Sequence, residues 1–277
     1  MSFTIRDILA MSMGNQVARM NSLFTRKLGD APCGSKNAYN QHAYSKSEWD
    51  ETVEAMEHGY ISDEFRDGIA DLFTTVIGSL WRAGDEDSSI FHLHSIPSHG
   101  GEQHFNSEAF NNYKTEIDRL IDDLSCFVSL QGVIKVSNKT FVEKLRELLN
   151  VLLQFADLVG IDPHADLSQV TLANLSKLCQ GQDALERTYE KYKEIGVELY
   201  HEEVEPNIFA VFSKGDQVGT DGKTYDADKF LKSADWHEPY FPSMTKDSAA
   251  AAASMAVAQV QTTPKAQLVD EKGQPLI

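Results

Sequence analysis

The stretch that decides the fold reads Ser62-Asp-Glu-Phe-Arg-Asp67-Gly-Ile-Ala-Asp71-Leu-Phe-Thr-Thr-Val-Ile-Gly78-Ser-Leu80. Its apolar residues recur at the three-and-four spacing of one helix face, which predicts an amphipathic helix. Ser62 or Asp63 is suited to cap the start of this helix, and Gly84 is suited to end it. Asp67 and Asp71 are four residues apart, so they share one face of the helix.

A second pair of acidic residues precedes this stretch. Glu51 and Glu54 are three residues apart and share a face of the preceding predicted helix. A tight turn through residues 58–63 would bring this face opposite Asp67 and Asp71. Four carboxylates at close range repel one another unless a cation neutralises them, and hard oxygen ligands select Mg²⁺ or Mn²⁺. The alternative is that both pairs belong to solvated helix faces, which is the commoner role of acidic residues at this spacing.

Helical periodicity dominates the rest of the chain. We expect helices at residues 5–28, from Ser45 or Ser47 to Glu57, at 108–130, at 138–159, from Asp166 or Ser168 to Leu178, and at 182–195. Residues 206–233 combine a short apolar run with Gly and Asp, which predicts a small β-hairpin. From Ser248 the chain is rich in Ala, Gln, Thr and Pro, which predicts a flexible tail.

The composition argues against several classes of protein. Of the 277 residues 42% are hydrophobic, enough for a core, and the formal net charge of -17 disfavours nucleic-acid binding. No apolar run of about 18 residues or secretory signal is present, so we expect no membrane partner. The three cysteines are far apart, which fits a reducing cytoplasm. The Walker A, GxGxxG and GxSxG motifs of kinases, dehydrogenases and α/β-hydrolases are missing.

At the first acidic pair the sequence resembles a known family. Asp50-Glu51-x-x-Glu54 is similar to the EExxE motif of the all-α NTP pyrophosphatases, the MazG-like superfamily. Residues 67–78 resemble the next helix of that family, in the form seen in phage-type members. The resemblance implies an all-α fold, a MazG-like helical bundle with a small β-hairpin near the C-terminus.

Two departures from the family pattern stand in this region. Asp50 replaces the first Glu of EExxE, and Gly68 stands where the usual ExxD motif has its Glu. Either the carboxylate is displaced to Asp67, or Glu64-x-x-Asp67 serves in its place. The roles of Asp50 and Glu64 stay open.

A second resemblance lies downstream. Asn174-Leu-Ser-Lys177 is similar to the Asn-x-x-Lys helix of the same family, and the segment containing Lys229 and Lys232 resembles the hairpin and Pro-rich close of phage members. Residues 108–160 weakly echo the earlier acidic helices. They could be a tandem duplication that has lost its metal ligands, or a plain helical insertion. We therefore expect one domain over 1–246, with possible halves 1–107 and 108–246, and a tail at 247–277.

The resemblance implies hydrolysis of a nucleoside triphosphate to monophosphate and pyrophosphate. The implied metal ligands for Mg²⁺ (or Mn²⁺) are Glu51, Glu54, Asp67 and Asp71, and the implied substrate-binding residues are Asn174, Lys177, Lys229 and Lys232. Glu51 or Glu54 would orient or deprotonate the attacking water. The resemblance also implies a homo-oligomer in the cytoplasm, or in the host cytoplasm if the chain is viral.

Two other functions fit the same sequence. A non-catalytic acidic helical protein would use the negative surface to bind a basic partner. A nucleotide sensor would bind the triphosphate without cleaving it, because Gly68 lacks the carboxylate expected there. A separate His cluster could hold Zn²⁺ or Fe, although a loop without metal is the simpler interpretation; its members are His92, His94, His99 and His104.

Overall fold

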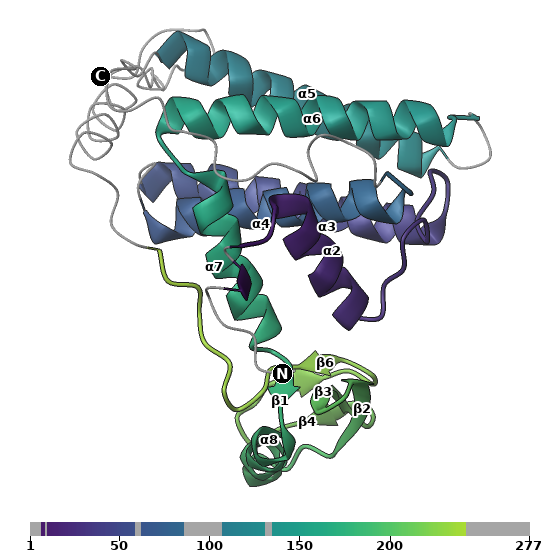
Figure 1. The fold of residues 1–277 in the computed structure, drawn as a ribbon, viewed down its shortest axis with the longest axis vertical. Helices are drawn as coiled ribbons and strands as arrows, with labels where there is room; N and C mark the ends of the chain where they lie inside the picture. Colours follow the sequence, from purple (N-terminus) through teal and green to yellow (C-terminus); the bar gives the residue numbers. More distant parts are fainter. Residues whose placement is uncertain (1–6, 9, 59–61, 86–106, 131–134, 242–277) are drawn as a thin grey trace, which may run out of the picture.

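The computed structural model of the chain describes residues 7–8, 10–58, 62–85, 107–130 and 135–241. It is mostly helical, as the sequence predicts, with short antiparallel strands toward the C-terminal end of the described part (Figure 1). The helices are α2 (Met13–Leu23), α3 (Lys36–Ala55), the 3₁₀ helix η1 (Met56–His58), α4 (Asp63–Arg82), α5 (Ser107–Ser129), α6 (Asn138–Val159), α7 (Pro163–Leu175) and α8 (Gln182–Glu194). The strands are β1 (Cys179–Gln180), β2 (Leu199–Glu205), β3 (Ile208–Ser213), β4 (Gln217–Val218), β5 (Thr224–Tyr225) and β6 (Phe230–Leu231).

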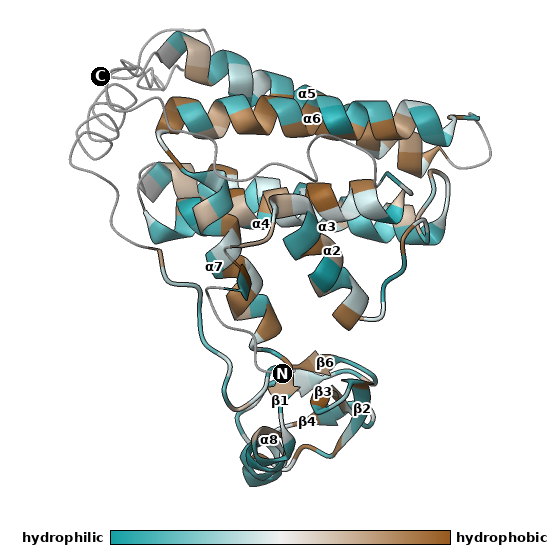
Figure 2. Ribbon diagram, in the orientation of Figure 1, coloured by the Kyte–Doolittle hydropathy of each residue, from teal (hydrophilic) through white to brown (hydrophobic). Residues whose placement is uncertain are grey.

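Four long helices, α3 to α6, form a bundle of two layers. In Figure 1 α5 and α6 lie above α3 and α4, and contacts join α3 with α4, α5 with α6, α4 with α6, and α3 with α5. Hydrophobic and hydrophilic residues alternate along α6 at the spacing of helix turns (Figure 2). This pattern gives the bundle an apolar interior and a polar outer surface.

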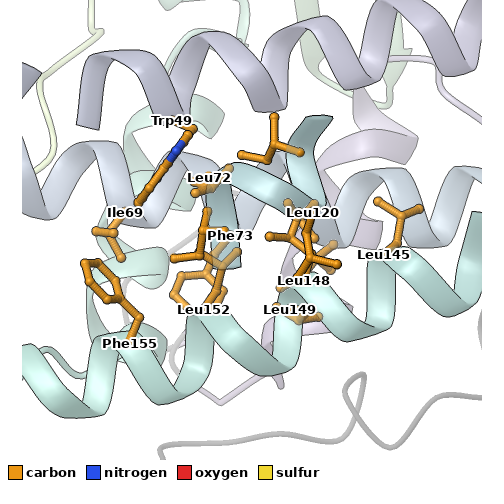
Figure 3. Close-up of a cluster of buried hydrophobic side chains, with 14 of the residues drawn as sticks. Trp49, Ile69, Leu72, Phe73, Leu120, Leu145, Leu148, Leu149, Leu152 and Phe155 are labelled. Atoms are coloured by element: carbon orange, nitrogen blue, oxygen red, sulfur yellow. The ribbon is translucent and has the colours of Figure 1, made fainter. Parts of the chain in front are cut away.

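The core of the bundle lies between the two layers. Figure 3 shows Trp49 of α3 and Phe73 of α4 on the side of the bundle that meets Leu152 and Phe155 of α6. The ring of Phe155 lies 6.2 Å from that of Trp49 and 6.4 Å from that of Phe65. Burial of each side chain of this size contributes roughly 1.5–3 kcal/mol. The core therefore fixes α3 and α4 against the rest of the bundle.

Helices α3 and α4 come closest together at Gly68 and Thr52. A Cβ atom at position 68 would lie 2.5 Å from Thr52 Oγ1 and 3.2 Å from Thr52 Cα. The Thr52 hydroxyl is held in place, because it donates a hydrogen bond of 2.6 Å to the carbonyl of Glu48. Gly68 thus allows this close approach, although glycine inside a helix is about 1 kcal/mol less favourable than alanine.

Helix α7 runs away from the bundle (Figure 1) and is joined to α4 by a buried ion pair. Arg66 Nε and Nη2 donate to the two carboxylate oxygens of Asp166 at 2.9 and 2.6 Å. Both side chains are almost fully buried. The ring of Phe241 lies 5.1 Å from Arg66 Cζ. Phe241, the last described residue, therefore contacts the same arginine that holds α7.

The strands form a small sheet around β3. This strand pairs with β1, β2 and β6, in each case antiparallel. Because side chains alternate along a strand, Ile208, Ala210 and Phe212 pack with residues of α2 and the end of α7, whereas Phe209 and Val211 pack against α8. The sheet therefore lies between α8 and the ends of two helices that come from the bundle side.

Four predicted helices are confirmed, with ends that differ by at most a few residues. They are α4, α5, α6 and α8. The start of α4 is capped by Ser62, whose hydroxyl accepts from the amide of Phe65 at 3.1 Å. The end of α6 is Gly160, which adopts a left-handed φ of 77°.

The predicted helix over residues 5–28 is wrong in its extent. Helix α2 begins only after Ser12, which accepts a hydrogen bond from the amide of Asn15 at 3.4 Å, and it ends at Leu23. Residues 10–12 are not helical. The apolar spacing continues across this break because Ile8 also packs into the core beside the sheet.

Two other predicted helix starts are wrong. Helix α3 begins at Lys36, well before Ser45, because Ser35 caps it by accepting from the amide of Ala38 at 3.0 Å. Helix α7 begins at Pro163, because the carboxylate of the preceding Asp162 accepts from two backbone amides. In both cases a residue with a short polar side chain further upstream satisfies the free amides of the first turn.

Antiparallel strands are present in the region of the β-hairpin predicted at 206–233, but the sheet is larger than predicted. The sheet also includes β2, which starts at Leu199, and β1, which starts at Cys179, while β4 and β5 form a separate small hairpin. The predicted tail from Ser248 and the histidines at 92–104 lie outside the described residues. None of the described helices combines the length and the apolarity needed to cross a bilayer.

Candidate functional site

Carboxylates from α3 and α4 gather on the side of the helix pair that faces α7. Glu48 and Glu51 come from α3, and Asp67 and Asp71 come from α4. Each of the four contributes to the electrostatic field at one or more of the others. We call these four residues the acidic cluster. Three of them, Glu48, Asp67 and Asp71, are half-buried, whereas Glu51 is exposed.

Three carboxyl groups of the acidic cluster, those of Glu48, Asp67 and Asp71, have raised pKa values. Burial, together with the charges of Asp67 and Glu48, raises the pKa of Asp71 to about 8. Burial and the charge of Glu51 raise the pKa of Glu48 to about 7. Burial and the charge of Glu238 raise the pKa of Asp67 to about 6. Ionising these three carboxyl groups is therefore unfavourable unless a cation compensates their charge.

Lys177 is the cation that faces the acidic cluster from α7. It follows the C-terminal end of this helix, and its Nζ donates to Asn174 Oδ1 at 2.5 Å. Burial lowers the pKa of Lys177, and the nearby charge of Asp71 acts in the opposite direction. The backbone of Lys177 is also fixed, because its carbonyl accepts from the amide of Ser233 at 3.1 Å. Lys232 is the second cation near this point, since its charge also acts on Lys177.

A cavity of about 530 Å³ opens beside the acidic cluster. Glu48 and Asp71 line it on the helix side, and the rings of Phe24, Phe212 and Phe230 line it on the side of the sheet. We call it the aromatic cavity. Its volume lies in the range of pockets that bind small organic molecules.

A smaller cavity of about 130 Å³ adjoins the first. Asp71, Asn174 and Lys177 line both cavities. The smaller one is also lined by Lys232 and Trp236, and Lys232 Nζ lies 3.3 Å from the centre of the Trp236 ring. Positive and negative groups therefore meet at the junction of the two cavities.

Most of the residues predicted from spacing and resemblance lie at this junction. Glu51, Asp67 and Asp71 belong to the acidic cluster, Asn174 and Lys177 line both cavities, and Lys232 lines the smaller one. Glu51 is exposed and lines neither cavity, so it joins the cluster only through its charge, which acts on Glu48, Asp67 and Asp71. Two other predicted residues lie farther from the site. Glu54 is exposed and lines neither cavity, because it lies on α3 away from the side that carries Glu48. Lys229 is exposed next to β6 and also lines neither cavity.

Glu48 is the site residue that sequence reasoning missed. It precedes Glu51 by three residues and Thr52 by four, so all three lie toward one side of α3. The buried face of α3 is marked in the sequence by its apolar residues, since Trp49 and Ala55 are both buried. This signal could have shown which acidic residues of α3 lie beside that face. Aligning a motif on Asp50 shifted the expected acidic face toward Glu54, which faces solvent.

The glycine at position 68 has a structural explanation. A side chain there would collide with Thr52, so a Glu at this position could not extend from α4 without pushing α3 away. Gly68 is therefore a point of close contact between the two helices. Asp50, the other departure, is exposed and accepts from Lys46 Nζ at 3.3 Å. Glu64 is also exposed.

The acidic residues of α5 and α6 are arranged differently. Arg119 is 2.5 Å from Glu116 and 2.7 Å from Asp123, and Lys144 is 2.7 Å from Glu147. These groups are exposed and paired, and pairing holds the pKa of Glu116 below its usual value. The echo of the acidic helices at residues 108–160 is thus a solvated network of ion pairs.

The donor set of the acidic cluster suits a hard divalent cation. Its ligand atoms are carboxylate oxygens, and its raised pKa values mark negative charge that a cation would neutralise. Within the described ranges, no three Asp, Glu, His or Cys side chains are grouped closely enough to hold an ion as they stand.

A comparison of this chain with protein-family models, with curated proteins and with solved structures finds no match in any of the three.

Proposed function

We propose that the chain is a Mg²⁺-dependent pyrophosphohydrolase of nucleoside triphosphates, with the helical arrangement of the MazG-like all-α NTP pyrophosphatases. The observation that carries this proposal is the meeting of the acidic cluster with Lys177 at the junction of two cavities. A triphosphate is an anion, and a site with excess carboxylates can accept it only together with a cation. Mn²⁺ would satisfy the same ligands.

The proposed metal ligands are Glu51, Asp67 and Asp71. Mg²⁺ is usually bound through one or two carboxylates, with water and substrate phosphates completing its shell. When bound, the ion supplies charge neutralisation at the phosphate oxygens. Glu48 and Glu51 provide the acidic pair at helical spacing that the family motif requires, three residues upstream of the pair expected from sequence.

The side chains of the site then divide the remaining work. Lys177 meets the phosphates as a point charge, and Asn174 holds its ammonium group. Glu48 takes the proton of the attacking water, since it lines the cavity and its pKa of about 7 suits a general base. The water oxygen bonds to the α-phosphorus, the bond from the α-phosphorus to the bridging oxygen breaks, and pyrophosphate leaves with the electron pair.

The test is pyrophosphate release from a panel of NTPs and dNTPs with Mg²⁺. We expect Glu48→Gln and Asp71→Asn to lower kcat at least 100-fold. Glu147→Gln, an exposed and paired carboxylate on α6, is the matched control and should retain activity. Glu54→Gln decides between the two acidic faces of α3, because activity that needs Glu54 would favour the pair first expected from spacing.

The other outcomes of this test identify the other functions. Nucleotide binding that needs Mg²⁺ but yields no pyrophosphate from any substrate would indicate a sensor. Absence of both Mg²⁺ and nucleotide binding would indicate a non-catalytic acidic protein and would end the enzyme proposal. The close contact of Gly68 with Thr52 gives a packing reason for a glycine at this position, and the binding and cleavage measurements decide between sensor and enzyme.

A further inference from the structure

The aromatic cavity has two chemically distinct ends. At the helix end stand the carboxylates of Glu48 and Asp71 with the ammonium group of Lys177. At the sheet end stand phenyl rings, among them Phe212 and Phe230. A ligand that fills this cavity must carry charge at one end and an apolar or aromatic group at the other.

The rings at the sheet end form a continuous row. Tyr200 stacks on Phe212 with ring centres 5.2 Å apart, Phe212 is 5.7 Å from Phe230, and Phe230 is 5.3 Å from Phe24 of the segment after α2. The last three are only partly buried and line the cavity. Phe230 is tilted by 54° to Phe212 and by 64° to Phe24, so the row forms a preformed aromatic corner that offers a flat group one ring to stack on and others to meet edge-on.

The cavity is also lined by two amide side chains, Asn21 and Gln41, whose amide nitrogens both lie near Gly78 of α4. Gln41 is oriented from both sides, since its Oε1 accepts from Arg82 Nη1 at 2.7 Å and its Nε2 donates to the carbonyl of Thr75 at 3.4 Å. Arg82 is fixed in turn by Asp30 at 2.7 Å. Asn21 lines the same cavity, and its Nδ2 donates to the carbonyl of Val17 at 2.9 Å. Amide groups of this kind both donate and accept hydrogen bonds, as the edge of a base requires.

We propose that the aromatic cavity binds the nucleobase of the substrate, stacked on the ring of Phe212 and in edge contact with the tilted ring of Phe230, with the polar edge of the base toward Asn21 and Gln41. This inference rests on the proposed function, because it is the triphosphate that would lie at the helix end. It deepens that function by assigning the organic half of the substrate to an aromatic base. Stacking on exposed rings tolerates different bases, so discrimination among bases falls to the two amides.

Strand β3 supplies a matched pair of variants for the test. Phe212 faces the cavity, whereas Phe209, on the same strand, faces α8. Phe212→Leu and Phe209→Leu remove the same ring from opposite faces of the sheet. Phe230→Leu, on the neighbouring strand β6, is the second cavity variant should either of the first two fail to fold.

The experiment measures binding by calorimetry with Mg²⁺ and two probes. One is a set of α,β-imido dNTP analogues, which resist cleavage between the α- and β-phosphorus, and the other is inorganic tripolyphosphate, which lacks a base. We expect wild type to bind the analogues at least tenfold more tightly than tripolyphosphate. Phe212→Leu should weaken the analogues about tenfold and leave tripolyphosphate unchanged. Phe209→Leu should leave the affinities for the analogues and for tripolyphosphate unchanged.

The outcomes separate this inference from the proposed function. Equal affinity for analogues and tripolyphosphate, or equal losses in Phe212→Leu and Phe209→Leu, would overturn the base cavity even if the chain releases pyrophosphate. Failure of wild type to bind the analogues would also overturn it. Conversely, tight and Phe212-dependent binding with no cleavage of any natural triphosphate would uphold the cavity and end the hydrolase proposal.

Discussion

At the scale of single residues, the feature with the widest consequences is the carboxyl group of Asp71. It lines both cavities, and burial raises its pKa to about 8. A carboxyl group in such surroundings destabilises the folded chain when it ionises. The same charge is what would bind a cation, so stability without metal and affinity for metal are opposed at this position.

This opposition predicts the behaviour of Asp71→Asn. In the presence of a chelator, the variant should be more stable than wild type at pH 8 by at least ~2 kcal/mol, because ionising the buried carboxyl group costs stability and the amide does not ionise. Addition of Mg²⁺ should raise the Tm of wild type and leave that of the variant unchanged. Thermal unfolding followed by circular dichroism measures both. A variant less stable than wild type without metal would contradict the account.

Gly68 leads to a second prediction at this scale. Gly68→Ala should destabilise the chain by about 1–3 kcal/mol, because the added methyl group collides with Thr52. Helix propensity alone predicts the opposite sign, a gain of about 1 kcal/mol. Urea unfolding decides between them. Gly215→Ala is the control, since nothing lies within 4 Å of a Cβ there, and its effect should stay within about 0.5 kcal/mol.

At the scale of elements, the buried ion pair between α4 and α7 determines whether Lys177, which follows α7, reaches the acidic cluster. Arg66 and Asp166 form this pair inside the protein, and burial keeps the pKa of Asp166 above its ordinary value in spite of the arginine. Removing one partner of a buried pair leaves the other charge uncompensated. The stability of the contact between the two helices is therefore a property of the pair.

We expect Asp166→Ala to lower the free energy of unfolding by about 3–5 kcal/mol. The double variant Arg66→Met with Asp166→Leu should recover most of this loss, because it replaces both charges by apolar groups of similar size. Urea unfolding of the two variants and of wild type tests this. A loss below about 1 kcal/mol in Asp166→Ala would show that the pair contributes little.

The elements also show how far sequence reasoning reaches. Long amphipathic helices such as α6 were predicted closely, because their apolar spacing is regular and Gly160 ends the helix with a recognisable cap. The predicted start of helix α3 is too late, because residues 36–47 are mostly polar. Only the packing of the whole bundle shows which of them face inward. Helix starts depend on single hydrogen bonds from caps such as Ser35, which several nearby serines could make equally well.

The same limits apply to the site. Asp67 and Asp71 were predicted from their spacing on one helix, and Lys177 from a resemblance. Glu48 was missed because aligning a motif by residue identity does not show which residues of α3 lie on the face toward the site. The aromatic cavity could not be predicted, since Phe24 and Phe212 are far apart in the sequence and meet only when the sheet packs against α2.

At the scale of the whole molecule, the acidic cluster predicts how stability depends on pH without metal. The ordinary pKa values of Asp71 and Glu48 are 3.8 and 4.5, and the folded protein raises them to about 8 and about 7. Between these limits the folded chain binds more protons than the unfolded chain, so the free energy of unfolding falls as pH rises. The loss should begin near pH 4 and be complete near pH 8.

This dependence can be isolated from that of other groups. His42 acts in the opposite direction, because burial lowers its pKa to about 4 and makes the fold less stable in acid. We therefore compare chelated wild type with the triple variant Glu48→Gln, Asp67→Asn and Asp71→Asn, in which His42 is unchanged. The difference in Tm should grow in favour of the variant from pH 4 to pH 8. A difference independent of pH would contradict the raised pKa values.

The close approach of Gly68 to Thr52 also sets the level along α4 at which the two helices carry their carboxylates nearest to each other. With a rise of 1.5 Å per residue, Asp67 lies about 1.5 Å and Asp71 about 5 Å along α4 from Gly68, whereas Arg82 lies about 21 Å from it. The acidic groups of α4 are thus concentrated within about one turn of the position where a larger residue would push α3 away. Any substitution that widens this contact would therefore dilute the local density of negative charge before it altered the rest of the bundle.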